Sequence, residues 1–363
     1  MHDESLALLT LTRVPGLGPQ RVRRLRAAFG SALAALGAGV DAWRAVLDGW
    51  TPRSVPDLAG AERERDRLRR LGATLLTDLE GPPFPSHWAA FDDLPVVLYV
   101  RGRWPERLAS WPPAAVAVVG SRRADAAALA FAEGLGRVLA SAGVVVVSGL
   151  AYGIDAAAHR GALSAGPGAA PTVAVLAGGV DRPGPSGNVA LAREILASGG
   201  ALVSETPIGS APARGSFPRR NRLVAALARS VAVVSAAAAS GAHLTAGHAA
   251  RYGRDVFVVP ARPWDDAYAG NLALLRDGAT ALCSLEEGPA LLAGVEAAPA
   301  RRDGAAVPAR LAWAWALLGR APAPLDVLVE RSGRTVGETL VALELLVAEG
   351  LATVDAGRRY GRR

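Results

Sequence analysis

The chain has 363 residues, of which 51% are hydrophobic and 20% charged, which is typical of a globular protein and excludes a disordered one. Its length exceeds one ordinary core, so we expect two or three domains. The net charge is +7 and all 40 basic residues are arginine, which favours a polyanionic partner. A single cysteine excludes an internal disulfide framework, and no apolar run is long enough to span a bilayer. A cytoplasmic protein without metal or cofactor is therefore expected.

Residues 1–80 are expected to form a helical module. Two segments with helical spacing of apolar residues, 6–11 and 22–29, flank the turn Val14-Pro-Gly-Leu-Gly-Pro19. This organisation resembles a helix-hairpin-helix, whose glycine turn can offer backbone amides to a phosphate. Four arginines follow the turn: Arg21, Arg23, Arg24 and Arg26. They are compatible with DNA contact, and a solvated helix face explains them equally well. A charged helix is expected over 61–71.

Residues 81–290 are expected to form a Rossmann-like α/β core, beginning with the break Gly81-Pro-Pro-Phe-Pro85. Short β-rich runs alternate with helical segments, which indicates a doubly wound, mostly parallel sheet. The expected strands are 96–100, 116–119, 144–147, 172–176, 201–203, 231–234 and 256–259. Small or polar residues follow several of them, and ligands of such sheets bind beyond the carboxyl ends of the strands. The predicted site is that crevice, unless the glycines serve only tight turns.

One βα unit, residues 114–140, combines a buried strand, a Gly120-Ser121 turn and an alanine-rich helix. The turn and the helix N-terminus are expected to attract an anion, and Arg122 adds a planar guanidinium suited to phosphate. The third glycine of a dinucleotide fingerprint is missing. The alternative is a plain strand-to-helix turn beside a solvated arginine.

Residues 206–254 contain no acidic side chain, and their densest basic part is 214–222. The arginines of this stretch are Arg214, Arg219, Arg220, Arg222, Arg229, Arg251 and Arg254. A single nucleic-acid strand would suit this pattern, with phosphates on arginines, a base stacked on Phe217 and a hydrogen bond from Asn221. In the alternative, Phe217 lies in the core and the arginines pair with carboxylates elsewhere.

Two further motifs lie at strand ends. The first, Ser240–Ala246, opens a helix and is a second candidate phosphate site, through Gly241 and Thr245. The second places Asp155 and His159 one helical turn apart, which permits an acid–base couple or two metal ligands. Because no third ligand or nucleophile is evident, a structural role is preferred, with Asp155 as a helix N-cap, and no catalytic residue is assigned.

Residues 291–308 are expected to be a linker and 309–363 a small helical domain. Helices are expected over 311–318, 325–330 and 336–349, followed by a short hairpin. Three helices and a wing describe a winged helix, a fold that binds either DNA or a protein partner.

The ordered motifs of the chain resemble the DNA-processing protein A family (DprA or Smf). They are Gly120-Ser121-Arg122, Ser148–Asp155 with His159, Ser204-Glu205, Phe217–Arg222, Gly241 with Leu244-Thr245-Ala246, and Val258-Val259-Pro260. The resemblance implies a non-catalytic, single-stranded-DNA-binding, homodimeric protein that protects incoming DNA and loads a RecA-type recombinase in natural transformation. The predicted DNA-binding residues are Gly120, Ser121, Arg122, Arg214, Phe217, Arg219, Asn221, Arg222, Gly241 and Thr245.

Two other functions stay open. Asp155 and His159 would suit a nucleotide-processing enzyme, although the Pro-Gly-Gly-x-Gly-Thr signature of related phosphoribohydrolases is absent. The winged helix would suit a duplex-DNA-binding regulator. Against the latter, the helices over 325–330 and 336–349 carry more glutamates than arginines, which is poor for a major-groove reader.

Overall fold

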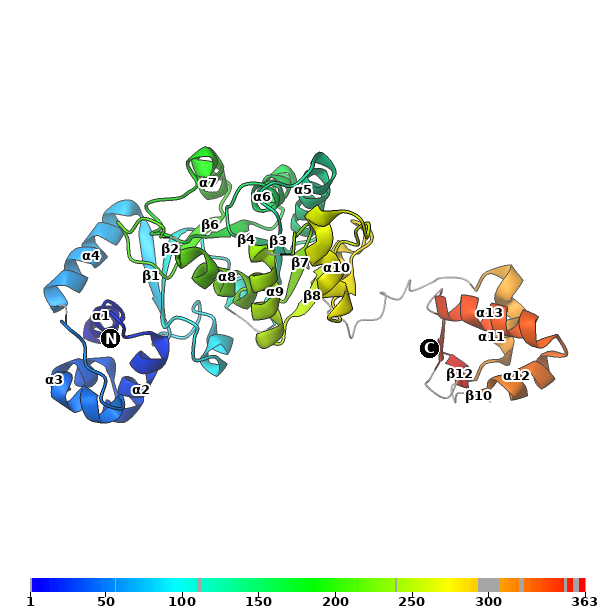
Figure 1. The fold of residues 1–363 in the computed structure, drawn as a ribbon, viewed down its shortest axis with the longest axis horizontal. Helices are drawn as coiled ribbons and strands as arrows, with labels where there is room; N and C mark the ends of the chain where they lie inside the picture. Colours follow the sequence, from blue (N-terminus) through cyan, green and yellow to red (C-terminus); the bar gives the residue numbers. More distant parts are fainter. Residues whose placement is uncertain are drawn as a thin grey trace. The chain divides into compact units, whose positions relative to one another are not determined.

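The computed structural model describes residues 2–55, 57–109, 112–213, 215–238, 240–292, 307–319, 323–348, 351–354 and 359–362. The chain divides into two compact units, Met1–Gly294 and Val295–Arg363 (Figure 1). Within the described ranges, no helix is both long and apolar enough to cross a bilayer.

A mostly parallel sheet forms the centre of the first unit. Its described strands run in the order β1-β2-β6-β5-β4-β3-β7-β8-β9. Their bounds are β1 (Ala73–Thr77), β2 (Val97–Gly102), β3 (Ala115–Val119), β4 (Val145–Ser148), β5 (Thr172–Val175), β6 (Ala201–Ser204), β7 (Ser230–Val233), β8 (Asp255–Val258) and β9 (Thr280–Ala281). Pairing is parallel from β6 to β9, whereas β1 and β2 are antiparallel additions. All the strands expected from the sequence are confirmed, with ends displaced by two residues at most.

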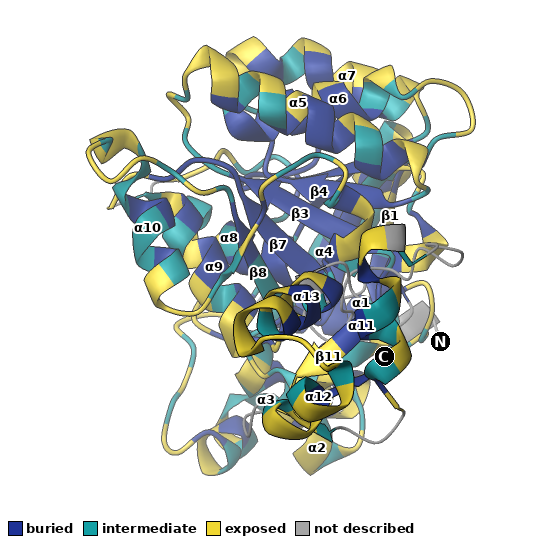
Figure 2. Cartoon of the chain, turned by 90° about the vertical axis from the view of Figure 1, so that its right-hand side faces the viewer, coloured by how far each residue is buried: buried dark blue, intermediate teal, exposed yellow. Residues whose placement is uncertain are grey.

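Helices cover both faces of the sheet (Figure 2). They are α5 (Ala126–Ser141), α6 (Ile154–Ser164) and α7 (Val189–Ala197) on one face, and α8 (Ser216–Ala226) and α9 (Gly241–Arg251) on the other. The alternation of side chains along β3 explains both layers. Val116 and Val118 pack with α5 and α6, while Ala115, Ala117 and Val119 pack with α8 and α9.

The direction of winding reverses between β3 and β7. From β3 the chain moves outward through β4, β5 and β6, and then returns to place β7 on the other side of β3. Such a reversal leaves a crevice at the carboxyl ends of the two strands. The ends are tied together there, because the Ser121 N–H donates to the Ser235 carbonyl at 2.7 Å.

The N-terminal helices pack against the β1–β2 end of the sheet (Figure 1). They are α1 (His2–Thr12), α2 (Pro19–Phe29), α3 (Ala32–Val46) and α4 (Leu58–Leu71). The sequence did not predict α3. The helical prediction for all of residues 1–80 is wrong at β1, which pairs with β2. Gly72, in the left-handed region at φ 66°, ends α4, and the threonine-rich segment that follows favours a strand.

The second unit has its own core, built around Leu328, Leu343, Leu346 and Tyr360. Its described helices and strands are α11 (Ala312–Leu317), α12 (Leu325–Ser332), α13 (Val336–Ala348), β10 (Ala323–Pro324), β11 (Ala352–Val354) and β12 (Arg359–Arg362). The antiparallel sheet order is β10-β12-β11, so the expected helices and hairpin are confirmed. Most of the predicted linker, residues 293–306, lies outside the described residues.

The remaining helices are short or flank the sheet. They are α10 (Ala269–Arg276) and the 3-10 helices η1 (Ser86–Ala90), η2 (Glu106–Leu108), η3 (Ser186–Asn188), η4 (Asp266–Tyr268), η5 (Gly288–Leu292) and η6 (Ala309–Leu311).

Candidate nucleic-acid interface

Two adjoining cavities lie at the carboxyl ends of the central strands, and we refer to them together as the crevice. The larger, of about 450 Å³, is bounded by the loops after β3, β4 and β7 and by α8 and α9. The predicted residues that line it are Gly120, Ser121, Arg122, Asn221, Gly241 and Thr245. The smaller, of about 140 Å³, shares Arg122 with it and adds Phe217. Most of the predicted site is thus gathered in one place.

The crevice presents a cation and an aromatic ring side by side. Arg122 is exposed, and its guanidinium carbon lies 5.2 Å from the centroid of the Phe217 ring. Phe217 is half-buried in the first turn of α8 and does not belong to any of the hydrophobic clusters of the described chain. Within the described ranges, Arg122 has no carboxylate within 4.0 Å. Its charge is therefore available to a phosphate and its neighbour's ring to a base.

Two backbone N–H groups at the turn after β3 already have acceptors within the chain. The Ser121 N–H is taken by the Ser235 carbonyl, and the Arg123 N–H by the Ser121 hydroxyl at 3.1 Å. The expected helix after the turn is confirmed as α5, which begins at Ala126. Asp125 caps it by accepting from the Ala128 N–H at 2.8 Å, and this carboxylate repels anions. The Arg122 side chain of this loop is exposed and is therefore the candidate anion-binding group.

The start of α9 agrees with its prediction. The helix begins at Gly241, and the Ser240 hydroxyl accepts from the Ala242 N–H at 3.2 Å. The Asn221 amide donates to the Gly241 carbonyl at 3.2 Å, and the Thr245 hydroxyl donates to the same carbonyl at 3.4 Å. Asn221 and Thr245 therefore fix the first turn of α9 at the edge of the crevice.

The glycines of the crevice serve two purposes. A Cβ at Gly120 would lie 2.7 Å from Cγ1 of Ile154, and one at Gly149 would lie 1.9 Å from Nη1 of Arg220. These two positions need glycine because loops pack closely there, which is the alternative reading. Gly241 differs, since a Cβ would lie 3.7 Å from its nearest neighbour, the Asn221 amide nitrogen.

A buried arginine that the sequence did not single out forms the floor of the crevice. Arg220 is 5% exposed, and its Nη1 donates to the carbonyls of Gly149 and Val175. The Asp155 carboxylate accepts from the N–H groups of Gly149 and Ala151 at 3.1 and 3.3 Å. Burial raises the pKa of Asp155 and lowers the pKa of Arg220, while their mutual attraction opposes both shifts. This charge pair holds the ends of β4 and β5 in place.

Asp155 and His159 have structural contacts. The N-cap of α6 is Gly153 and Asp155 lies in the first helical turn, so its expected N-cap role is wrong. His159 is fully buried with Nδ1 2.8 Å from the Thr172 hydroxyl, and burial lowers its pKa to about 3. In the part of the chain that the structure describes, no group of three or more His, Cys, Asp or Glu side chains is arranged to hold a metal ion.

Arg219 and Arg222 lie apart from the crevice. Both pair with Glu205, Arg219 at 3.1 Å, and both line a different cavity. Helical periodicity explains the separation: Phe217 and Asn221 are four residues apart on one face of α8, whereas Arg219 and Arg222 are three apart on another. The alternative reading of paired arginines thus holds for these two. Arg214 lies outside the described residues.

Three exposed side chains of the crevice were not predicted. Tyr152 and Arg182 line the smaller cavity beside Phe217, and Arg123 lines the larger. The signal for Tyr152 was its place in the loop that follows the buried strand β4. For Arg182 there was no such signal, because it lies in a long loop after β5.

Comparisons with known proteins place the chain in a family. The family model for DNA recombination-mediator protein A matches residues 76–291. A putative DNA processing protein DprA of Mycobacterium tuberculosis is 39% identical over 344 residues, covering 88% of this chain and 86% of its own. Protein Smf of Escherichia coli is 34% identical, covering 76% of this chain and 74% of its own.

Two solved structures have a similar fold. DNA processing protein A of Streptococcus pneumoniae gives a TM-score of 0.60 at 27% identity, covering 80% of this chain and 98% of its own. The protein of the same name from Helicobacter pylori, described for its single-stranded DNA binding mode, gives 0.53 at 28% identity, covering 61% of this chain and 95% of its own. The chain belongs to the DNA recombination-mediator protein A family, the DprA/Smf proteins.

Proposed function

We propose that the crevice binds single-stranded DNA and holds it without cleaving it. The observation that carries the proposal is the exposed Arg122 guanidinium over the half-buried Phe217 ring, in a cavity lined by the loops after β3, β4 and β5. Arg122, Arg123 and Arg182 would contact phosphates, and a base would stack on Phe217. A binding role is favoured over the nucleotide-processing alternative, because His159 is buried and Asp155 is held by backbone amides.

A single strand is favoured over a duplex by the position of the ring. Phe217 lies in a cavity of only about 140 Å³, together with Tyr152 and Pro212. A base reaches such a recess only when it is unpaired and turned out of its stack. The H. pylori relative, described for its single-stranded DNA binding mode, supports the same ligand class.

The wider role follows from family membership. We propose that the protein acts in the cytoplasm as a homodimer, protects incoming single-stranded DNA and delivers it to a RecA-type recombinase. From the helix and hairpin order of the second unit, we infer a winged helix. We assign it a protein-contact role rather than duplex reading, since Glu330, Glu338 and Glu344 lie on α12 and α13.

The proposal is tested by replacing the ring and measuring affinity for a labelled oligothymidylate by fluorescence polarisation. Phe217→Ala should weaken binding by about 1–3 kcal/mol, the usual contribution of one stacked base. That corresponds to roughly a 5- to 150-fold rise in Kd. Phe217→Tyr keeps an aromatic face and serves as the matched control, with binding close to that of the wild type.

Competition with unlabelled duplex separates the alternatives. Duplex should displace the labelled strand only at a large excess. Equal affinity of Phe217→Ala and wild type would contradict the stacking role. Equal competition by duplex and single strand would favour the duplex-binding regulator instead.

A further inference from the structure

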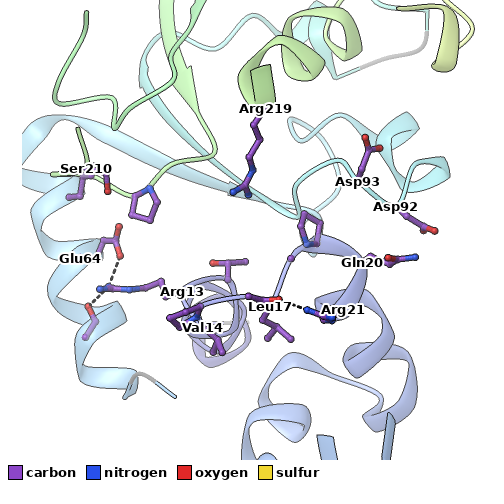
Figure 3. Close-up of a pocket in the computed structure, with 18 of the residues that line it drawn as sticks. Arg13, Val14, Leu17, Gln20, Arg21, Glu64, Asp92, Asp93, Ser210 and Arg219 are labelled. Atoms are coloured by element: carbon purple, nitrogen blue, oxygen red, sulfur yellow. Dashed lines mark hydrogen bonds and ion pairs between the residues drawn. The ribbon is translucent and has the colours of Figure 1, made fainter. Parts of the chain in front are cut away.

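A wide groove separates the N-terminal helices from the α/β core (Figure 3). It has a volume of about 1090 Å³. The arginines that line it are Arg13, Arg21, Arg63, Arg67, Arg219 and Arg222. No aromatic side chain is among its described lining residues, in contrast to the crevice. The chemistry of the groove therefore suits phosphates rather than bases.

Of the carboxylates that line the groove, Glu64 and Asp93 already have partners, and Asp92 lies on the side opposite α4 (Figure 3). Glu64 is buried, with Arg13 Nη1 at 2.5 Å. Asp93 accepts from the Tyr252 hydroxyl at 2.8 Å and lies 3.2 Å from Arg251. Asp92 stands beside Asp93, on the side of the groove opposite α4 (Figure 3). On α4, Arg63 has only an exposed Asp57 at 3.7 Å, and Arg67 has no ion pair among the described residues; Arg219, which shares Glu205 with Arg222, points into the groove from α8 (Figure 3).

One buried guanidinium at the groove lacks an acceptor. The Arg222 side chain is 7% exposed, and its Nη2 donates to Glu205. Its Nη1 is also buried, and no described residue accepts a hydrogen bond from it. A buried N–H without a partner is costly, so this groove-lining side chain has a hydrogen bond left to donate to an acceptor that reaches it.

The first turn of α2 adds to this environment. Gly18, Pro19, Gln20 and Arg21 all line the groove. The helix has no side-chain cap and no acidic residue in its first turn. Its positive end therefore faces the same space as the arginines.

The groove and the crevice are neighbours across α8. The loop between β6 and α8 lines both, with Pro207, Ile208 and Ser210 on the groove and Pro212 on the crevice. At the start of α8, Phe217 lines the crevice and Arg219 lines the groove. A strand that leaves the crevice over the first turn of α8 enters the groove directly.

We propose that the groove is a second phosphate-binding segment for the strand held in the crevice. The strand's sugar-phosphate backbone lies between α4 and α8, with phosphates on Arg63, Arg67 and Arg219 and on the free nitrogen of Arg222. The inference rests on the proposed function, because it extends that DNA path. Binding here is independent of base identity, since the groove offers no stacking surface.

The test compares two oligothymidylates on the full-length protein, one of about six nucleotides and one of about thirty, chosen around the usual site size of a single-strand-binding module. The variant is Arg63→Ala/Arg67→Ala, which removes two exposed arginines of α4 from the groove. The matched control, Arg69→Ala/Arg70→Ala, removes two exposed arginines of the same helix that do not line it.

The groove variant should lower the affinity for the long strand several-fold and leave the short strand unchanged. The slope of log affinity against log salt for the long strand should fall by about 1.4, or 0.7 for each lost phosphate contact. The control variant should match the wild type in both. A long strand whose second half is abasic should bind like the complete one.

Equal binding of the long strand by the groove and control variants would overturn the inference. Equal loss for the short and long strands would also overturn it, since the arginines would then act through general charge. Failure of the proposed function would give a different result. Phe217 lines the crevice and not the groove, so Phe217→Ala would then bind the short strand as tightly as the wild type does.

Discussion

The two sides of α8 use the same residue type in different ways. On the crevice side, Arg122 stands over Phe217 without a carboxylate partner among the described residues. On the groove side, Arg219 and Arg222 share Glu205. Between them Arg220 is buried and donates to two backbone carbonyls. Neighbouring arginines of α8 therefore differ in role, pairing for Arg219 and Arg222 and structural support for Arg220, while the unpaired Arg122 comes from the loop after β3.

The largest expected effect separates Arg220 from its neighbour Arg219. Arg220→Ala leaves the buried Asp155 carboxylate without its cation and two carbonyls without a donor. We expect a loss of about 3–5 kcal/mol in the free energy of unfolding. Arg219→Ala removes a side chain that is 60% exposed, and should cost no more than about 1 kcal/mol. Denaturant titration of both variants measures the difference.

A similar small loss for both variants would break the comparison. Arg220 would then contribute no more than a surface ion pair, and the floor of the crevice would need another support. A variant that removes both charges, Arg220→Met/Asp155→Leu, should recover part of the lost stability, because no unpaired charge remains buried.

The sequence predicts the sheet far better than it predicts the arginines. The predicted parallel strands are short apolar runs rich in Val between turn residues, so their type and bounds follow from the pattern, whereas the two-residue β9 was not predicted. The sequence analysis did not predict β1, because its five residues follow a long charged helix and pair only with β2. The packing of a non-local partner, not local preference, decides such a segment.

For the site, sequence order conveys which residues lie at strand ends but not which side of a helix they face. Gly120, Arg122 and Gly241 follow strands, and the structure brings them together. Arg219 and Arg222 belong to the same motif as Phe217, yet the turn of α8 carries them to Glu205. The absence of acidic residues from 206–254 suggested unpaired arginines, but their partner, Glu205, comes directly before that stretch.

The second prediction concerns pH and the buried groups behind the crevice. The His159 imidazole has a pKa of about 3 in the folded chain, against 6.5 when solvated, because burial and the nearby Arg220 disfavour its charged form. Between these values the unfolded state binds more protons, so stability falls as the pH is lowered. The contribution of this residue is about 1.4 kcal/mol per pH unit in that window.

His159→Leu should flatten this acid dependence relative to the wild type, in denaturant titrations at pH values between about 6.5 and 4. A His159 resonance that titrates near pH 6.5 in the folded protein would contradict the buried, neutral imidazole. It would also reopen an acid–base role beside Asp155.

The smallest expected effect distinguishes the two kinds of glycine in the crevice. Gly241→Ala adds a methyl group with its nearest neighbour at 3.7 Å, so the free energy of unfolding should change by no more than about 0.5 kcal/mol. The methyl group lies at the crevice edge, where it keeps a strand from close approach to α9, and we expect a loss of about 1 kcal/mol or less in oligothymidylate binding.

Gly149→Ala should instead lower the free energy of unfolding, because its Cβ would meet Arg220 Nη1 at 1.9 Å and destabilise the fold. Polarisation and denaturant titration of the two variants give both quantities. If Gly241→Ala bound DNA as tightly as the wild type, the strand would not approach α9, and its path would be confined to Arg122, Phe217 and the loops after β4 and β5.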